Sequence, residues 1–354
     1  CLPITMLEAG LSHHGEIGWD PNEMELANGS TVKEFILLGF GVEQHKRHLL
    51  LLLFTVLYVL AVAENLTVIA LVLVDTHLAQ LPMYILLSHF SWLEVCYVTT
   101  TVPRMLFDLA FPYGVISFHA CFLQFYIFFS LGFTECFFLS AMALDRYLAI
   151  CHPLRYPQIM SKVTCYALVA VSWVCGFLGY IVPLTLISKL PFCGPIIDHF
   201  LCDPGPLLLL ACPPLDSATF IWHFSMSVLL VVGNFLFVLL SYSVVIFTLM
   251  KPSYQGSRKK AFSTISFHLA VVTLFYGPVI GMYVTPDGES NFQLAKIITT
   301  FYTAVTPFLN PLIYCLRNDQ VREAVWRLLR KREKWMKRKV IMEKGGKERP
   351  NVIS

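Results

Sequence analysis

Met142–Pro157, which reads MALDRYLAICHPLRYP, is the stretch that decides the fold. Asp145 and Arg146 follow a long apolar run, and a proline-broken loop that carries Arg155 comes next. Because a charged side chain is costly inside a lipid bilayer, this pair predicts a helix that leaves the membrane at one of its faces. A solvated pair at the end of an ordinary helix gives the same local pattern, so the rest of the chain decides between the two interpretations.

The composition favours the membrane interpretation. Of the 354 residues, 56% are hydrophobic and only 14% are charged, whereas soluble domains carry about 25% charged residues. The apolar residues gather into seven blocks, and each block reaches the roughly 20 residues that a helix needs to cross a bilayer. The blocks run approximately over 49–74, 82–103, 118–149, 163–187, 219–249, 261–285 and 293–316. Since the alternating pattern of a membrane barrel is absent, we predict an all-α membrane protein, a seven-transmembrane helix bundle.

Lysine and arginine are unevenly distributed between the two ends of the predicted helices. With Arg146 taken as cytoplasmic, most of the 26 Lys and Arg fall on its side, including those of the carboxyl tail. The positive-inside rule then places the amino terminus outside and the tail inside. A glycosylation sequon at Asn28 agrees, since its acceptor must reach the secretory lumen. We expect a multi-pass plasma-membrane protein with an extracellular segment 1–48, a transmembrane domain 49–316 and a cytoplasmic segment 317–354.

Three motifs together resemble the olfactory receptor family of rhodopsin-like G-protein-coupled receptors, in its class II (tetrapod) branch. They are the opening stretch, Lys260–His268 (KAFSTISFH) and Pro307–Asn318 (PFLNPLIYCLRN). The resemblance implies a receptor, not an enzyme, that needs no cofactor and binds a small, mostly apolar, volatile odorant in the outer half of the bundle. It also implies activation of a stimulatory G protein that raises cyclic AMP. The resemblance begins near Met24, so we expect residues 1–23 to be a disordered upstream extension.

The chain departs from the family pattern at several positions. Leu144 stands where the family usually has a tyrosine, which puts the role of that residue in doubt but not that of Arg146. In the sixth block, Ile265 replaces a cysteine and Phe267 replaces a small residue. In the first block, Glu64 replaces the usual glycine before an asparagine, and the sequence names no partner for this carboxylate.

The resemblance assigns an activation switch to residues near the cytoplasmic ends of the helices and to Tyr276 beneath the ligand pocket. At rest Asp145 neutralises Arg146, and on activation the guanidinium swings inward, where Tyr242 can face it. A proline inside the seventh helix removes a backbone hydrogen bond and kinks that helix. The residues assigned to switching and G-protein coupling are Asp145, Arg146, Tyr147, Tyr242, Tyr276, Asn310, Pro311 and Tyr314.

Helical counting locates a candidate ligand pocket. Counting back from Arg146 places four residues on one face of the third helix, about four turns above its cytoplasmic end: Phe128, Phe129, Gly132 and Phe133. The resemblance makes this face part of the ligand pocket, and the same counting brings to it Met226, Val279, Tyr283 and Thr303. Such a pocket is aromatic and apolar with a few hydroxyls. Core packing is the alternative explanation for any single phenylalanine.

Four cysteines fall at predicted extracellular positions, where disulfides are the natural interpretation: Cys121, Cys193, Cys202 and Cys212. Four cysteines allow three pairings, and the sequence alone does not choose between them. The resemblance implies the pairs Cys121–Cys202 and Cys193–Cys212.

Two carboxylates, Glu94 and Glu135, lie inside predicted helices at acidic positions of the family. With Asn310 they form either a small cation site, for which sodium is the candidate ion, or a pair of protonated and hydrogen-bonded acids. No spacing of transition-metal ligands, phosphate loop or nucleophile constellation is present, so we expect no other metal and no enzymatic activity.

The tail after Asn318 carries apolar residues at helical spacing between charged ones: Val321, Ala324, Val325, Leu328 and Leu329. We expect a short amphipathic cytoplasmic helix 8, with the basic run 330–339 held to anionic membrane lipids. The expected partners are an odorant, a stimulatory olfactory-type G protein and lipids, but no nucleic acid. Two alternatives are a rhodopsin-like receptor for a non-odorant metabolite in non-olfactory tissue, and a transporter or channel, whose inverted repeats we do not see.

Overall fold

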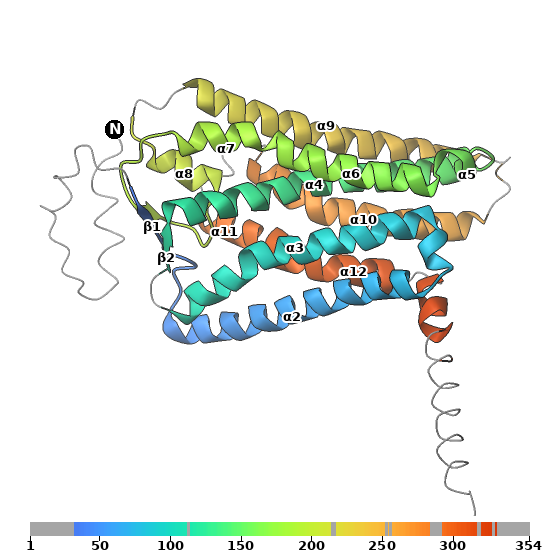
Figure 1. Cartoon of the computed structure of the whole chain (residues 1–354), viewed down its shortest axis with the longest axis horizontal. Coiled ribbons are helices and arrows are strands. Elements are labelled where there is room, and N and C mark those ends of the chain that lie inside the picture. The colour runs from blue at the N-terminus through green and yellow to red at the C-terminus, as the bar shows by residue number, and fades with distance from the viewer. Residues whose placement is uncertain are drawn as a thin grey trace, which may run out of the picture.

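Long helices run side by side along one axis in the computed structural model (Figure 1). The structure describes residues 32–111, 114–213, 217–251, 254, 257–283, 292–316, 320–327 and 330. Asn28 and residues 1–23, for which the sequence predicts a glycan and disorder, lie outside the described residues. In chain order the helical elements are α2 (Gln44–Val74), η2 (Leu78–Gln80), α3 (Pro82–Ala110), α4 (Phe118–Cys151), α5 (Tyr156–Ile159), α6 (Lys162–Gly179), α7 (Ile181–Ser188), α8 (Pro204–Leu210), α9 (Ser217–Met250), α10 (Arg258–Tyr283), α11 (Phe292–Thr300), η3 (Phe301–Val305) and α12 (Thr306–Leu316).

Each of the seven predicted apolar blocks lies on one of these helices or on a consecutive set of them. Five described segments are long and apolar enough to cross a membrane: α2, α4, α6 with α7, and the described parts of α9 and α10. The other two blocks form α3 and the series α11–η3–α12. Large apolar side chains such as Leu49 and Leu52 are 67% and 65% exposed on α2. Such surfaces are unfavourable in water and are accommodated by lipid.

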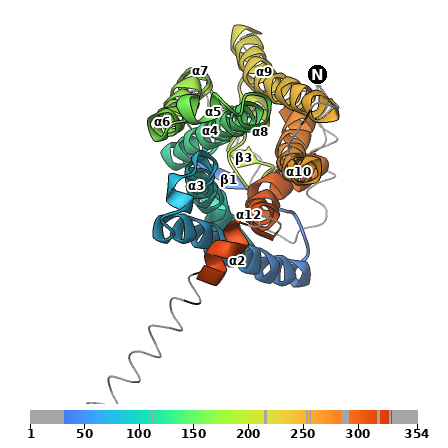
Figure 2. The ribbon, with the colours of Figure 1, turned by 90° about the vertical axis from the view of Figure 1, so that its right-hand side faces the viewer.

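Helix α4 is the central helix of the bundle. In its most apolar stretch 72% of the residues are buried, against 22% in α2 and 28% in the α6–α7 segment. Figure 2 looks along the bundle and shows α6 and α3 on one side of it, with α9 and α10 on the other. A residue on α4 can therefore contact helices from both sides, which makes α4 the natural helix on which to build an internal site.

Two helices are interrupted close to that site. Tyr180 separates α6 from α7, and Pro183, three residues later, lacks the N–H that a continuous helix would direct to Gly179. In the last span, residues Phe301–Val305 form a π-helix, which places one extra residue in the turn. Both interruptions change which side chains face the bundle interior.

A three-stranded sheet with the strand order β2-β1-β3 lies at the end of the bundle that carries Cys121 (Figure 1). The strands are β1 (Glu34–Leu37), β2 (Gly114–Ser117) and β3 (Ile196–Ile197). β1 pairs with β2 in antiparallel and with β3 in parallel orientation. These strands were not predicted from the sequence. We call this end the outer end, and the end that carries Arg146 the inner end.

Disulfides fix the loop that follows α7. Cys121 at the start of α4 is bonded to Cys202, with their Cα atoms 5.6 Å apart. Cys193 is bonded to Cys212, with a Cα separation of 5.0 Å. These are the two pairs that the family resemblance implied, and they hold the loop against the outer end of α4.

Residues 320–327 are helical and lie at the inner end, where the sequence predicts an amphipathic helix. Val321 and Ala324 are buried, and Nε of Arg327 lies 2.9 Å from Oδ2 of Asp75, the residue that ends α2. Burial of the carboxyl group acts to raise the pKa of Asp75, but the Arg327 guanidinium and the backbone N–H groups of Leu78 and His77 lower it below its ordinary value. The carboxylate therefore stays charged and ties this helix to α2.

Candidate functional site

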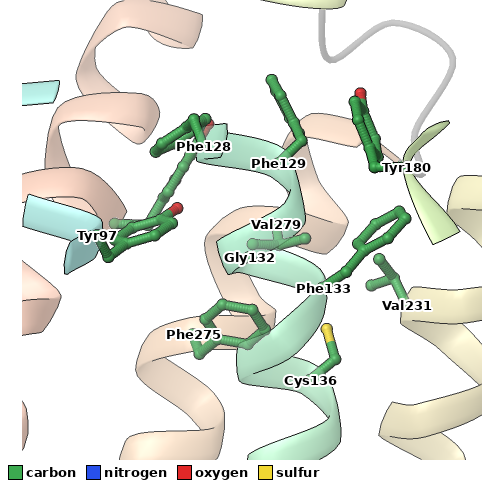
Figure 3. Close-up of a pocket in the computed structure, with 11 residues that line it drawn as sticks. Tyr97, Phe128, Phe129, Gly132, Phe133, Cys136, Tyr180, Val231, Phe275 and Val279 are labelled. Atoms are coloured by element: carbon green, nitrogen blue, oxygen red, sulfur yellow. The ribbon is translucent and has the colours of Figure 1, made fainter. Parts of the chain in front are cut away.

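A cavity of about 40 Å³ lies against α4 in the outer half of the bundle (Figure 3). It is lined by Tyr97, Phe128, Phe129, Gly132, Phe133, Cys136, Tyr180, Val231, Phe275, Val279 and Tyr302. These residues come from α3, α4, α9, α10, η3 and the break between α6 and α7. The only polar side-chain atoms among them are three tyrosine hydroxyls and one thiol. Cavities of this composition suit small apolar molecules.

Stacked aromatic rings form two walls of the cavity. The rings of Tyr97 and Phe128 are stacked with centroids 4.8 Å apart, and those of Phe129 and Tyr180 are stacked at 5.1 Å. Between them, Gly132 leaves a gap, since a Cβ atom there would meet only Cε2 of Tyr97 at 3.9 Å (Figure 3). The volume of about 40 Å³ is well below the roughly 300–1,000 Å³ of typical ligand pockets. A molecule that needs a pocket of that usual size can enter only when these rings move apart.

Five of the eight residues assigned to the pocket from sequence line this cavity: Phe128, Phe129, Gly132, Phe133 and Val279. Thr303 is fully buried in η3 but is not among the lining residues, and its neighbour Tyr302 lines the cavity instead. The π-helical turn explains this difference, because counting at 3.6 residues per turn does not allow for an extra residue. Met226 and Tyr283 lie on α9 and α10, but their side chains are outside the described part of the structure.

Six further lining residues were not predicted from the sequence: Tyr97, Cys136, Tyr180, Val231, Phe275 and Tyr302. Cys136 lies one turn below Gly132 on the same face of α4, so helical counting could have found it. Tyr180 depends on the break between α6 and α7, for which Pro183 was the available signal.

A larger cavity, of about 670 Å³, lies between α2, α3 and α6. Trp92 and Tyr166 in its lining are 50% and 53% exposed, so it opens to the outside of the bundle. None of the residues predicted for ligand binding or switching lines it. We therefore take the smaller, internal cavity as the candidate ligand site.

Buried polar side chains lie between α3, α4 and α12. Nδ2 of Asn310 donates a hydrogen bond to Oε1 of Glu94 over 2.5 Å. Three further oxygens are buried without a hydrogen-bond partner among the described residues: Oε2 of Glu94, Oε1 of Glu135 and Oδ1 of Asn310. Hard cations prefer such oxygen ligands, so this donor set fits an alkali ion. This set has only two carboxylates and one amide, and in the described part of the chain there is no candidate metal site made of three or more His, Cys, Asp or Glu side chains.

At the inner end, both carboxylate oxygens of Asp145 are occupied. Arg146 forms an ion pair with Oδ2, to which its Nε donates over 2.9 Å. The hydroxyl of Tyr156 on α5 donates to Oδ1 over 2.8 Å. Burial and the negative charge of Asp145 raise the pKa of Tyr156, which keeps its hydroxyl protonated as a donor. Asp145 is fully buried, and its bond to Arg146 holds the guanidinium group against α4.

The other switch residues surround this network or lie beneath the cavity. Tyr242 on α9 is buried close enough to Arg146 for an electrostatic interaction. Tyr147 shares a hydrogen bond of 3.1 Å with His152 at the end of α4. Tyr276 is fully buried and packs against Phe235, with ring centroids 5.1 Å apart. Pro311 lies inside α12, and the side chain of Tyr314 is outside the described part of the structure.

Comparisons with known proteins agree with this architecture. A sequence model of the family described as "Olfactory receptor" matches residues 54–332. Human olfactory receptor 11H6 is 50% identical over 299 residues, which cover 84% of this chain and 90% of the relative. Human olfactory receptor 11G2 is 50% identical over 300 residues, covering 84% and 86%, and human olfactory receptor 11H2 is 44% identical over 328 residues, covering 92% and 98%.

The chain belongs to the olfactory receptor family.

Membership confirms the predicted seven-transmembrane bundle and the odorant-receptor class, and the members of this family are receptors, not enzymes. As an olfactory receptor, the chain is a multi-pass membrane protein, and the family needs no cofactor.

Proposed function

We propose that this olfactory receptor binds a small, mostly apolar, volatile odorant in the aromatic cavity against α4. The observation that supports this proposal is the lining itself, in which aromatic and aliphatic side chains from six of the seven spans meet around Gly132. Pushing these rings apart would displace Phe275 and the adjacent Tyr276, both on α10. Ligand binding would thereby be coupled to a movement of α10.

We further propose that Arg146 leaves Asp145 when α10 moves, and that a stimulatory heterotrimeric G protein then binds at the inner end and raises cyclic AMP. The buried Asp145–Arg146–Tyr156 network is the resting state of this switch. Glu94, Glu135 and Asn310 would hold a sodium ion in the resting bundle. With the G protein bound at the inner end, the outer end lies outside the cell. The two disulfides of the outer end support this placement, since such bonds persist in oxidising compartments.

The test is a cyclic AMP assay of cells that carry the receptor, exposed to a panel of odorants, with surface staining of every variant. Gly132→Trp should fill the cavity and abolish responses while the receptor still reaches the surface. Gly233→Trp is the matched control, because Gly233 is exposed on α9 and a Cβ there would meet no atom within 4 Å. Unaltered potency of Gly132→Trp would refute the pocket assignment. An Arg146→Ala variant that signals normally would refute the switch.

Two further checks address orientation and ligand class. If the amino terminus is extracellular, the unaltered receptor should carry a glycan that Asn28→Gln protein lacks, and Asn28→Gln protein that is still glycosylated would overturn the assignment. A receptor that ignores every volatile odorant but responds to a non-volatile metabolite would favour the alternative, a role in non-olfactory tissue.

A further inference from the structure

Residues 33–41, which we call the amino-terminal strap, cross the outer end of the bundle and join two of its loops. β1 is the central strand of the sheet, between β2 from the loop after α3 and β3 from the loop after α7. The backbone N–H of Ile36 donates to the carbonyl of Pro195 over 2.7 Å, and that of Phe118 donates to the carbonyl of Lys33 over 2.8 Å. The strap therefore connects both loops to the start of α4.

At the end of the strap, Phe40 packs between α2 and the loop after α7, a contact that we call the Phe40 clasp. Phe40 is stacked between Phe54 of α2, with ring centroids 5.7 Å apart, and Phe200 of the loop, at 4.8 Å. The flanking residues Gly39 and Gly41 have φ angles of 62° and 61°. Only glycine adopts this left-handed conformation without steric cost, and two such residues turn the Phe40 ring back into the bundle.

A row of aromatic side chains then leads from the strap to the cavity. Phe35 is fully buried, and its ring centroid lies 5.9 Å from that of Phe118. Down α4, successive ring centroids lie 4.6, 5.9 and 5.3 Å apart, in the order Phe118, Phe122, Phe125 and Phe129. Phe129 lines the cavity. The row thus runs from the outer end to the cavity, and Phe35 of the strap packs against its first ring, Phe118.

We propose that the amino-terminal strap is the gate of the ligand cavity: the cavity is reached from the outer end when β1 separates from β2 and Phe40 leaves its place between Phe54 and Phe200. This inference rests on the proposed function, because it takes the cavity against α4 as the ligand site. The rival route runs sideways from the lipid between two helices and leaves the strap closed.

Cys136 provides a reporter of access that needs no odorant. Its thiol lies in the cavity lining and is 2% exposed (Figure 3). Cys165, fully buried at the start of α6 near the inner end, reports on general loosening. The rate at which N-ethylmaleimide modifies each thiol in the full-length receptor in nanodiscs can be followed by peptide mass spectrometry. This measurement is independent of signalling, so its failure would leave the proposed function untouched.

The first variant removes the clasp. Phe40→Ala loses its two ring contacts, so Cys136 should be modified about 5-fold faster while Cys165 is unchanged. Leu38→Ala is the matched control, because Leu38 lies on the same strap but is 49% exposed, and it should behave like the unaltered receptor. An unchanged rate at Cys136, or an equal rise at both thiols, would overturn the gate.

A second pair of substitutions locks the strap and does not remove a buried ring. Ile36 and Val115 are direct partners in β1 and β2, and neither is buried. The double variant Ile36→Cys with Val115→Cys, oxidised with copper phenanthroline, should slow modification of Cys136 several-fold relative to either single variant. If the cross-linked receptor is modified at the same rate as the single variants, access does not pass the strap and the proposal is wrong.

Discussion

The ammonium group of Lys296 on α11 lies 2.6 Å from Oδ1 of Asp198 in the loop after α7. The Lys296 side chain is 4% exposed, whereas that of Asp198 is 42% exposed. A buried ammonium group is costly unless a carboxylate accompanies it. The pair therefore ties the loop after α7 to the last span, and the Cys121–Cys202 disulfide ties the same loop to α4.

The asymmetry in burial predicts unequal effects of removing either partner. Asp198→Asn leaves the buried ammonium without its counter-charge and should destabilise the receptor by about 1–3 kcal/mol, less than for a fully buried pair because Asp198 is partly solvated. Lys296→Met leaves a carboxylate that water can reach, so its effect should be smaller. Thermal unfolding of the purified receptor measures both. Lys189→Met, at an exposed lysine, is the control, and a larger loss for Lys296→Met would contradict the argument.

The neighbouring His199 predicts that stability depends on pH. His199 is fully buried, and its Nδ1 accepts a hydrogen bond from the backbone N–H of Leu201 over 3.2 Å. Burial, followed by the charge of Lys296, lowers the pKa of His199 from 6.5 to about 3. At a pH between these two pKa values, the imidazole of His199 is protonated in the unfolded chain but neutral in the folded receptor. The stability contributed by neutral His199 is therefore complete above pH 6.5 and falls, by up to about 1.4 kcal/mol per pH unit, as the pH decreases.

The measurement is the melting temperature of the receptor between about pH 7 and about pH 5, the range in which His ordinarily titrates. His199→Asn is the comparison, because the amide oxygen can still accept from Leu201 but does not titrate. We expect a shallower decline for this variant. Identical declines for the two proteins would show that another group causes the dependence.

Gly176 on α6 lies in close contact with Thr134 on α4. A Cβ atom at Gly176 would lie 2.0 Å from Oγ1 and 2.7 Å from the backbone nitrogen of Thr134. Backbone atoms cannot yield as a flexible side chain does, so Gly176→Ala should cost at least about 1–3 kcal/mol and reduce surface expression. Gly179→Ala on the same helix is the control, since its Cβ would meet its nearest atom at an ordinary 3.6 Å. Equal expression of the two variants would exclude this close approach.

The parts of this architecture that depend on composition or on regular helical geometry could be predicted from the sequence. The seven spans follow from block length and apolar content. Phe128 and Phe133 were located by counting along α4, because that helix is unbroken from Phe118 to Cys151.

Features that depend on irregular backbone or on contacts between distant segments could not be predicted. Tyr302 replaces Thr303 in the cavity because of a π-helical turn. β1 is only four residues long, and its pairing with Gly114–Ser117 and Ile196–Ile197 is a tertiary contact that no local pattern encodes. The partner of Asp75, Arg327, is likewise 252 residues away in the chain.

The hydrogen bond from Tyr156 to Asp145 predicts higher basal signalling when it is lost. Tyr156→Phe removes the donor to Oδ1, so the resting network retains only the bond to Arg146. A hydrogen bond to a charged group contributes about 1.5–3 kcal/mol, but Tyr156 is partly exposed, so a shift near the lower end of this range is expected. Basal cyclic AMP, divided by surface expression, should be higher for Tyr156→Phe than for the unaltered receptor. It should be higher still for Asp145→Asn. Tyr166→Phe, at a 53% exposed tyrosine, is the control. If Tyr156→Phe leaves basal signalling at the level of this control, Tyr156 does not restrain the switch.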